Sequence, residues 1–168
     1  LGTGSYTDVV SAVEELMAGE RPEYFGDIHR TYEDGARLVT TPPYTAYLKI
    51  AEGCSNGCAF CIIPRLRGKY RSRSMGALLA EAKKLADSGV KELIVIAQDI
   101  TRYGLDLEPK ASLAQLVREL CRLDFHWIRL HYLYPEAVTG ELIDVIASEP
   151  KVLHYLDIPI QHCNDGIL

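Results

Sequence analysis

The chain has 168 residues, of which 48% are hydrophobic and 24% are charged, and this composition excludes a disordered chain. Lys and Arg number 18 against 23 Asp and Glu, and the net charge of -5 argues against nucleic-acid binding through bulk charge. No apolar run is long enough to cross a membrane and the first residues do not resemble a signal peptide, which predicts a cytoplasmic protein without a membrane partner.

The first predicted element is a helix within residues 9–17, where apolar side chains recur at helical spacing. Gly19 stands where a helix end favours a residue that tolerates positive φ. Residues 20–43 carry scattered charge and the Pro42-Pro43 pair without a sustained period, which is typical of a linker. We therefore expect residues 1–41 to be a helix and linker that follow a domain missing from this chain.

From Tyr44 onward, short apolar runs alternate with helical periods. The predicted strands are residues 44–51, 93–97, 127–133 and 152–160. Helices are predicted around residues 78–86, 113–120 and 142–146, with Ser74 and Ser112 as N-caps of the first two and Gly89 after the first. This alternation predicts an α/β fold, either an open parallel sheet or a (β/α) barrel. A complete barrel takes roughly 250 residues, so we expect an incomplete one in a fragment of a longer protein.

Three cysteines crowd into the loop that follows the first of these strands. Cys54, Cys58 and Cys61 are separated by three and two residues, and Gly53, Asn56 and Gly57 let the backbone turn sharply between them. Three thiolates from one loop suit a four-iron, four-sulfur cluster whose fourth iron is open to a small molecule. A structural zinc site completed by a distant cysteine or histidine, and three inert buried thiols, are the alternatives.

The cysteine loop resembles the signature of radical S-adenosylmethionine enzymes, with Phe60 as the aromatic residue before the third cysteine. The similarity extends through residues 61–68 and Arg71-Ser72-Arg73 to the methylthiotransferase branch of that superfamily, and covers residues 44–168. It implies a partial (β/α) barrel of the radical SAM type over residues 42–168, incomplete at the carboxyl terminus. It also implies a [4Fe-4S] cluster held by the three cysteines, and bound S-adenosylmethionine near Phe60.

Two members of that branch modify different substrates, an aspartate of a small-subunit ribosomal protein or an adenosine of transfer RNA. Residues 97–104, 129–135 and 156–162 resemble the type that modifies the ribosomal protein. The alternatives are the transfer-RNA type, and a structural-metal module that docks on RNA or on the ribosome.

The resemblance also implies a reaction and its partners. An electron donor reduces the cluster, S-adenosylmethionine is cleaved to a 5′-deoxyadenosyl radical, and the radical abstracts hydrogen from the β-carbon of the aspartate. Sulfur delivery in this family uses a second cluster on an amino-terminal domain, and a carboxyl-terminal domain binds the substrate. Both domains are expected to lie outside this chain, so we expect it not to complete the reaction alone. No catalytic side chain is assigned.

Two further residues are candidates for binding S-adenosylmethionine. The superfamily places a polar contact to the methionyl amino group after the second barrel strand, where Gln98 stands; alternatively, Gln98 and Asp99 begin a turn and cap the next segment. Arg129 is on the strand face that His131 shares, where a guanidinium could hold the cofactor carboxylate. The alternative for Arg129 is an interior ion pair with Asp157 or Glu52.

The remaining polar residues have weaker assignments. His131, Gln161 and His162 are more typical of hydrogen-bonded core residues than of catalysts. Five cations alternate along residues 65–73, namely Arg65, Arg67, Lys69, Arg71 and Arg73. They predict a solvated or salt-bridged loop over the cluster, with a track for RNA or an acidic domain as the alternative. Cys121 and Cys163 are expected to be buried small apolar residues without a role.

Overall fold

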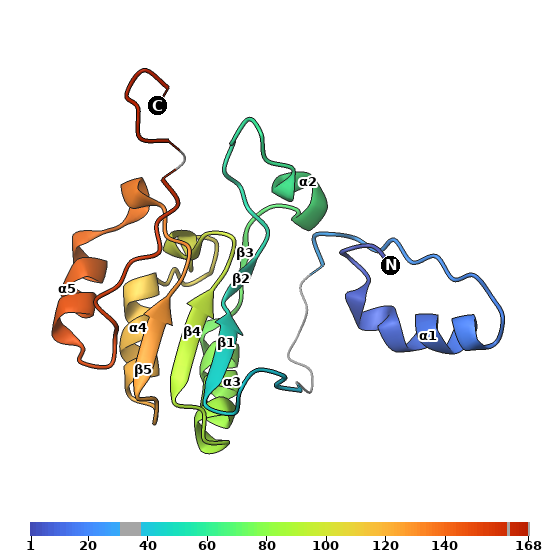
Figure 1. Cartoon of the computed structure of the whole chain (residues 1–168), viewed down its shortest axis with the longest axis horizontal. Helices are drawn as coiled ribbons and strands as arrows, with labels where there is room; N and C mark the ends of the chain where they lie inside the picture. The colour runs from blue at the N-terminus through green and yellow to red at the C-terminus, as the bar shows by residue number, and fades with distance from the viewer. Residues whose placement is uncertain (31–37, 161, 168) are drawn as a thin grey trace. The chain divides into compact units, whose positions relative to one another are not determined.

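The computed structural model describes residues 1–30, 38–160 and 162–167 (Figure 1). The chain divides into two compact units. The first is Leu1–Glu33 with Glu52–Arg71, and the second is Asp34–Ala51 with Ser72–Leu168. Across the described ranges, none of the helices has both the length and the apolar character needed to cross a bilayer.

The first unit contains the predicted amino-terminal helix and the cysteine loop. The 3-10 turn η1 (Tyr6–Asp8) leads into helix α1 (Val9–Met17), and Gly19 adopts a φ of 90° after its end, as predicted. The segment after α1 folds back beside it, because Tyr24 Oη donates to Glu15 Oε1 at 2.6 Å and Gly26 N donates to Ser5 Oγ at 2.7 Å. The first part of the predicted linker is therefore packed against its own helix, while residues 31–37 lie outside the described ranges.

The second unit is built on a parallel sheet in the order β1-β4-β5, formed by Thr45–Lys49, Glu92–Ile96 and Trp127–Leu130. The register pairs Tyr47 with Ile94, and Ile94 with Arg129. The long helices are α3 (Met75–Asp87), α4 (Leu113–Cys121) and α5 (Gly140–Ser148), with the 3-10 turns η2 (Ile100–Arg102) and η3 (Pro135–Ala137). A separate two-stranded sheet joins β2 (Ala51–Glu52) to β3 (Arg71–Ser72).

The helix boundaries follow the predicted caps. Ser74 Oγ accepts a hydrogen bond from Ala77 N at 3.3 Å, and Gly89 follows α3 with a φ of 95°. Ser112 and Gln115 form a reciprocal capping box at the start of α4, with hydrogen bonds of 3.1 and 3.0 Å. These two predicted N-caps are confirmed.

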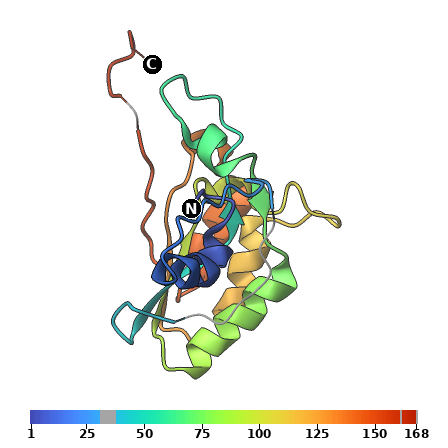
Figure 2. The same cartoon turned by 90° about the vertical axis from the view of Figure 1, so that its right-hand side faces the viewer.

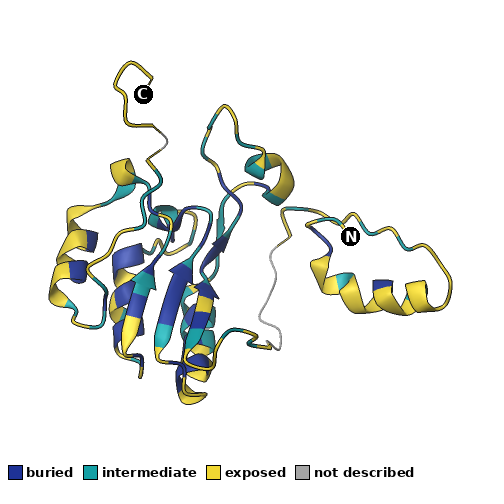
Figure 3. Cartoon of the chain, viewed as in Figure 1, coloured by how far each residue is buried: buried dark blue, intermediate teal, exposed yellow. Residues whose placement is uncertain are grey.

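One face of the sheet forms the core of the second unit. In Figures 1 and 2, α3 and α4 lie along one side of the three strands. Alternate strand residues are fully buried, whereas Tyr47 and Trp127 on the other face are 41% and 47% exposed. Figure 3 shows the same contrast between the buried strands and the exposed outer surfaces of the helices. The side chains that carry the core are Ala46, Leu48, Leu93, Val95, Ile128 and Leu130.

The predicted α/β fold with parallel strands is confirmed, and the sheet does not close into a barrel within the described residues. The predicted strand over 152–160 is wrong, because Val152 makes one isolated parallel bridge to Ile128 and no ladder follows. Pro159 has no N–H to donate to a ladder. The strand predicted over 127–133 ends at Leu130, because Tyr132 has a φ of 70° and turns the backbone out of the extended conformation.

Candidate functional site

The cysteine loop begins where the chain leaves β2 and is held by backbone contacts within the first unit. Cys54 is 7% exposed and its N–H donates to the carbonyl of Gly68 at 3.1 Å. Gly53 has a φ of 78°, and a Cβ there would lie 2.3 Å from the carbonyl oxygen of Lys69. The start of the loop therefore requires glycine, both for its conformation and for the close approach of another backbone segment.

The sulfur atoms of this loop are thiols that take part in no disulfide. These thiols belong to Cys54, Cys58 and Cys61, and Asn56 N donates to the sulfur of Cys54 at 3.4 Å. The N–H of Cys61 closes a turn onto the carbonyl of Cys58 at 3.1 Å. Backbone N–H groups directed at sulfur are one of the means by which proteins tune iron–sulfur clusters. The donor set therefore fits a cluster that takes three cysteines from one loop.

The three thiols do not converge into a ready-made metal site. Throughout the part of the chain that the structure describes, no three His, Cys, Asp or Glu side chains lie close enough together to hold a metal ion. Bonds to a shared centre supply the free energy that draws such ligands together. The assignment of these cysteines as cluster ligands therefore stays a prediction that rests on their spacing and chemistry. Phe60, between them, is 77% exposed.

The basic residues that follow the loop are largely used inside the fold. The guanidinium of Arg71 donates to three carbonyls, those of Lys69, Ile28 and Arg67, at 2.6, 2.8 and 3.2 Å. Arg67 lies 3.6 Å from Glu52, and Arg73 binds Glu81 at 2.7 Å. Arg65 and Lys69 are exposed. The predicted salt bridges are therefore present, and a continuous RNA track loses three of its five cations to structural contacts.

Helix α2 (Ile63–Arg67) also lies in this segment, for which the sequence predicted a loop. The helix has only five residues, and Pro64 stands in its first turn. Too few apolar positions recur over that length for a period to be recognised. Proline at the start of the segment was the available signal.

In the second unit, Gln98 and Asp99 follow β4 at the carboxyl edge of the sheet and have separate roles. Asp99 is 1% exposed and caps η2 by accepting from Thr101 N at 3.0 Å, as the turn alternative predicted. Gln98 Oε1 is buried, and none of the described residues donates a hydrogen bond to it. A buried amide oxygen without a donor costs stability unless a ligand supplies one. An ammonium group, such as that of a bound amino acid, fits this atom.

Arg129 makes an ion pair, with a partner different from those considered in the sequence. Its Nη2 and Nε lie 2.7 and 2.9 Å from Glu92 Oε1, and its Cζ lies 5.5 Å from the centre of the Tyr155 ring. Glu92 is the first residue of β4, whereas Gln98 lies two residues beyond its last residue. The guanidinium therefore reaches toward the amino-terminal half of β4. A contact of Arg129 with the cofactor carboxylate stays a prediction.

Residues beyond β5 form the rest of this edge. His131 N donates to Val95 O at 3.0 Å, and its ring lies 6.3 Å from that of Tyr155. Tyr132 N donates to Asp157 Oδ2 at 3.1 Å. His162 is exposed and its Nδ1 accepts from Asn164 N at 3.0 Å, which differs from the expected core position, while Gln161 lies outside the described ranges.

The other two cysteines differ from each other. Cys121 is buried as predicted, and burial raises the pKa of its thiol to about 11. Cys163 is exposed, so the prediction of burial is wrong for it. Its segment follows the extended residues after Val152, which do not pair as a strand.

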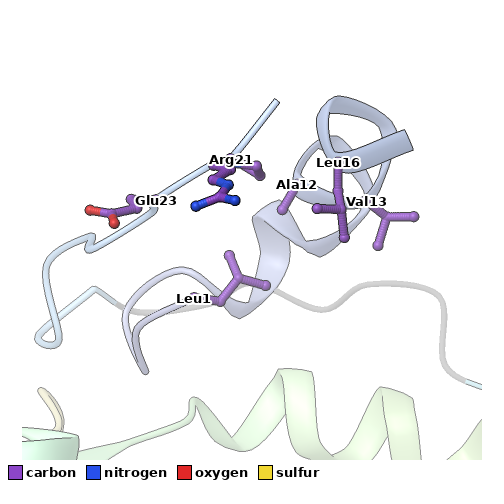
Figure 4. Close-up of a pocket in the computed structure, with 7 residues that line it drawn as sticks. Leu1, Ala12, Val13, Leu16, Arg21 and Glu23 are labelled. Carbon is purple, nitrogen blue, oxygen red and sulfur yellow. The ribbon is translucent and has the colours of Figure 1, made fainter. Parts of the chain in front are cut away.

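A pocket of about 390 Å³ lies in the first unit, between α1 and the segment that folds back beside it (Figure 4). None of the residues predicted for the cluster or the cofactor lines it. Its walls are Leu1, Ala12, Val13, Leu16, Arg21, Pro22 and Glu23.

Comparison with known families distinguishes a radical enzyme that holds an iron–sulfur cluster from a structural-metal module. The radical SAM superfamily matches residues 48–168. The chain belongs to the radical SAM superfamily. Enzymes of this superfamily use a [4Fe-4S] cluster and S-adenosylmethionine.

Similar named relatives are methylthiotransferases of this superfamily. The chain is 52% identical over 170 residues to the ribosomal protein uS12 methylthiotransferase RimO of Caldanaerobacter subterraneus, and 52% identical to that of Clostridioides difficile. The matches cover 100% of this chain but 39% and 38% of the relatives. The chain therefore spans about two fifths of the length of these proteins.

Solved structures support the fold. The methyltransferase TsrM from Kitasatospora setae, a radical S-adenosylmethionine enzyme solved with cobalamin and a [4Fe-4S] cluster, aligns with a TM-score of 0.59 and 18% identity. The alignment covers 83% of this chain and 27% of TsrM. At this identity the likeness concerns the fold alone.

Proposed function

We propose that this chain is the part of a radical SAM methylthiotransferase that binds the cluster and S-adenosylmethionine, and that the whole enzyme modifies the β-carbon of an aspartate in a small-subunit ribosomal protein. The observation that carries the proposal is the identity of about one half over the whole chain to relatives named for ribosomal protein uS12. The motif residues at 97–104, 129–135 and 156–162 support the same substrate.

In this proposal each side chain has a defined task. Cys54, Cys58 and Cys61 hold the cluster, and the N–H of Asn56 stabilises negative charge on the Cys54 sulfur. When bound, the cluster supplies the electron that splits S-adenosylmethionine into methionine and a 5′-deoxyadenosyl radical. Phe60 contributes an apolar surface within the cysteine loop.

Gln98 binds the methionyl ammonium of S-adenosylmethionine through its buried amide oxygen. The support is the absence of any donor to Oε1 among the described residues, together with the position of Gln98 two residues beyond β4. The ammonium donates the missing hydrogen bond. Arg129 is the candidate for the cofactor carboxylate, and binding there requires its guanidinium to exchange or share the Glu92 contact.

The whole enzyme needs further partners. By resemblance, a second cluster on a preceding domain delivers sulfur, a following domain binds the substrate, and a separate protein donates the electron. A ribosomal substrate implies that the enzyme works in the cytoplasm. Three of the five cations along residues 65–73 make contacts within the fold. The proposal therefore assigns this segment no RNA-binding role, and the enzyme meets RNA only because its substrate is a ribosomal protein.

The test is a modification assay with the full-length protein, reconstituted anaerobically and supplied with S-adenosylmethionine and a reductant. Ribosomal protein uS12 and transfer RNA are offered separately, and mass spectrometry records whether a methylthio group replaces a hydrogen. We expect modification of an aspartate in the protein and none in the RNA. Modification of adenosine alone would overturn the proposal. Cys58→Ala is expected to abolish the reaction, and Cys163→Ala, a cysteine outside the motif, is expected to preserve it.

A further inference from the structure

Tyr132 has an unusual backbone conformation at the carboxyl edge of the sheet. Its φ of 70° is the only positive φ of a non-glycine residue in the described ranges. L-residues with a side chain are strained in this left-handed region, which glycine adopts freely. A turn that served only to redirect the chain after β5 would be less strained with glycine. The tyrosine side chain at this position therefore needs a reason of its own.

The strained conformation is held by hydrogen bonds on both sides of the residue. Tyr132 N donates to Asp157 Oδ2 at 3.1 Å, and the next N–H, that of Leu133, donates to Asp157 O at 2.9 Å. The carbonyl of Tyr132 accepts from Ile100 N at 3.1 Å. Asp157 therefore fixes the backbone from one side, and the turn after Gln98 fixes it from the other.

Burial accounts for only part of the tyrosine side chain. Its side chain is 38% exposed, whereas the neighbouring Leu133 is completely buried and packs in the core. The Tyr132 ring lies 6.3 Å from that of Tyr134 with an interplanar angle of 54°, so two aromatic rings stand together after β5. Residues with a strained backbone cluster at sites that bind ligands, and part of this ring stays accessible to one.

The position suits a ligand that also reaches Gln98. Ligands of open α/β sheets bind beyond the carboxyl ends of the strands. Tyr132 follows β5 by two residues. Its carbonyl accepts a hydrogen bond from the N–H of Ile100, which begins η2 two residues after Gln98. An exposed aromatic ring at this edge offers a flat apolar face, which is the chemistry that recognises a nucleobase.

We propose that Tyr132 contacts bound S-adenosylmethionine through its adenosine portion, and that Asp157 is a positioning residue that acts through the Tyr132 backbone. The proposal rests on cofactor binding at this edge, but it does not depend on which macromolecule is modified. An aromatic contact with the polypeptide substrate is the competing outcome.

The experiment measures two properties of the full-length, anaerobically reconstituted protein: its thermal unfolding midpoint, and its dissociation constant for S-adenosylmethionine by equilibrium dialysis. Tyr132→Gly removes both the ring and the strain. We expect the unfolding midpoint to stay equal or rise, and the dissociation constant to increase about tenfold or more. Tyr132→Phe keeps the ring and is expected to bind the cofactor as the parent does. Tyr44→Gly, at a 60% exposed tyrosine before β1, is the matched control and is expected to leave affinity unchanged.

The role of Asp157 is tested by a double-mutant cycle. Asp157→Ala frees the N–H of Tyr132 and is expected to weaken cofactor binding severalfold in the parent, with no further loss in Tyr132→Gly.

Unchanged cofactor affinity in Tyr132→Gly would overturn the proposal. If the Michaelis constant for the ribosomal protein rose while cofactor affinity stayed constant, the contact would belong to the substrate. A lowered unfolding midpoint in Tyr132→Gly would show a structural residue and overturn it as well. A failure of the proposed function would be distinguishable. In that case the ribosomal protein would not be modified, while the cofactor affinities of the variants would still follow this pattern.

Discussion

Asp99 is the most deeply buried carboxylate in the described residues and organises the turn after β4. Its side chain accepts from Thr101 N at 3.0 Å and from the Thr101 hydroxyl, and Arg102 Nε lies 3.3 Å from it. Because the carboxylate accepts hydrogen bonds from both Thr101 donors, its removal takes away the partner of each.

We expect Asp99→Ala to lower the free energy of unfolding by about 1–3 kcal/mol. The matched control is Asp124→Ala, at an 84% exposed carboxylate that pairs with Lys91 at 3.0 Å, where the loss should stay within about 0.5 kcal/mol. Urea denaturation of both variants measures the two losses. Equal losses would contradict the structural role of Asp99.

For individual residues, the sequence indicated candidates better than it indicated their hydrogen-bond and ion-pair partners. Gln98 could be proposed because the superfamily resemblance points to the end of a strand, and Arg129 because strand alternation is visible in a sequence. The ion pair of Arg129 with Glu92 joins residues 37 positions apart and depends on the register of two strands. The strain at Tyr132 was missed, since no glycine or asparagine marks it and Asp157, which holds it, lies 25 positions away.

Among the elements, the start of the cysteine loop has a tight steric requirement. A Cβ at Gly53 would meet the carbonyl oxygens of Lys69 and Gly68 at 2.3 and 2.6 Å, whereas a Cβ at Gly57 would meet nothing within 4 Å. The same loop therefore contains one glycine that is required by packing and one that has room for a side chain.

Gly53→Ala is expected to destabilise the loop by about 2 kcal/mol or more and to lower the iron content after reconstitution. Gly57→Ala is expected to leave both the unfolding midpoint and the iron content close to the parent. Thermal unfolding and iron analysis of the two variants test this difference. A Gly53→Ala protein with the parent's stability and iron content would refute the close approach of residues 68 and 69.

Helices were predicted more reliably than strands. The caps at Ser74 and Ser112 are local signals, since the residues that form each cap lie three positions apart. The predicted strand at 152–160 failed because pairing with β5 is a non-local condition, and β5 turns away after Leu130. The apolar side chains of residues 152–160 indicate that the segment can be buried, but they do not indicate whether a partner strand lies beside it.

The stability of the whole molecule is expected to depend on alkaline pH through one buried phenol. Tyr103 is 1% exposed and donates to the carbonyl of Arg73 at 3.1 Å. Burial raises its pKa from 10.0 to about 12, against a smaller opposing effect of Arg73. Because the folded protein favours the protonated phenol, its contribution to stability is complete below pH 10 and is lost between pH 10 and 12.

Tyr103→Phe removes the titrating group and leaves the Arg73 carbonyl without this donor. We expect the variant to be less stable than the parent near neutral pH by about 1 kcal/mol, and the gap to shrink as pH rises from 10 toward 12. Urea denaturation over this range measures the gap. A gap that stays constant with pH would contradict the buried, protonated state of Tyr103.

The central claim for the whole molecule is that one loop holds a four-iron cluster through Cys54, Cys58 and Cys61. Its most direct test is the quantification of iron, acid-labile sulfide and zinc, with visible absorption spectra, in the anaerobically reconstituted full-length protein. Cys58→Ala is expected to lose about four iron and four sulfide relative to the parent, while Cys163→Ala loses none. Unchanged iron, sulfide and absorption in Cys58→Ala, or zinc in place of iron in the parent, would contradict the account.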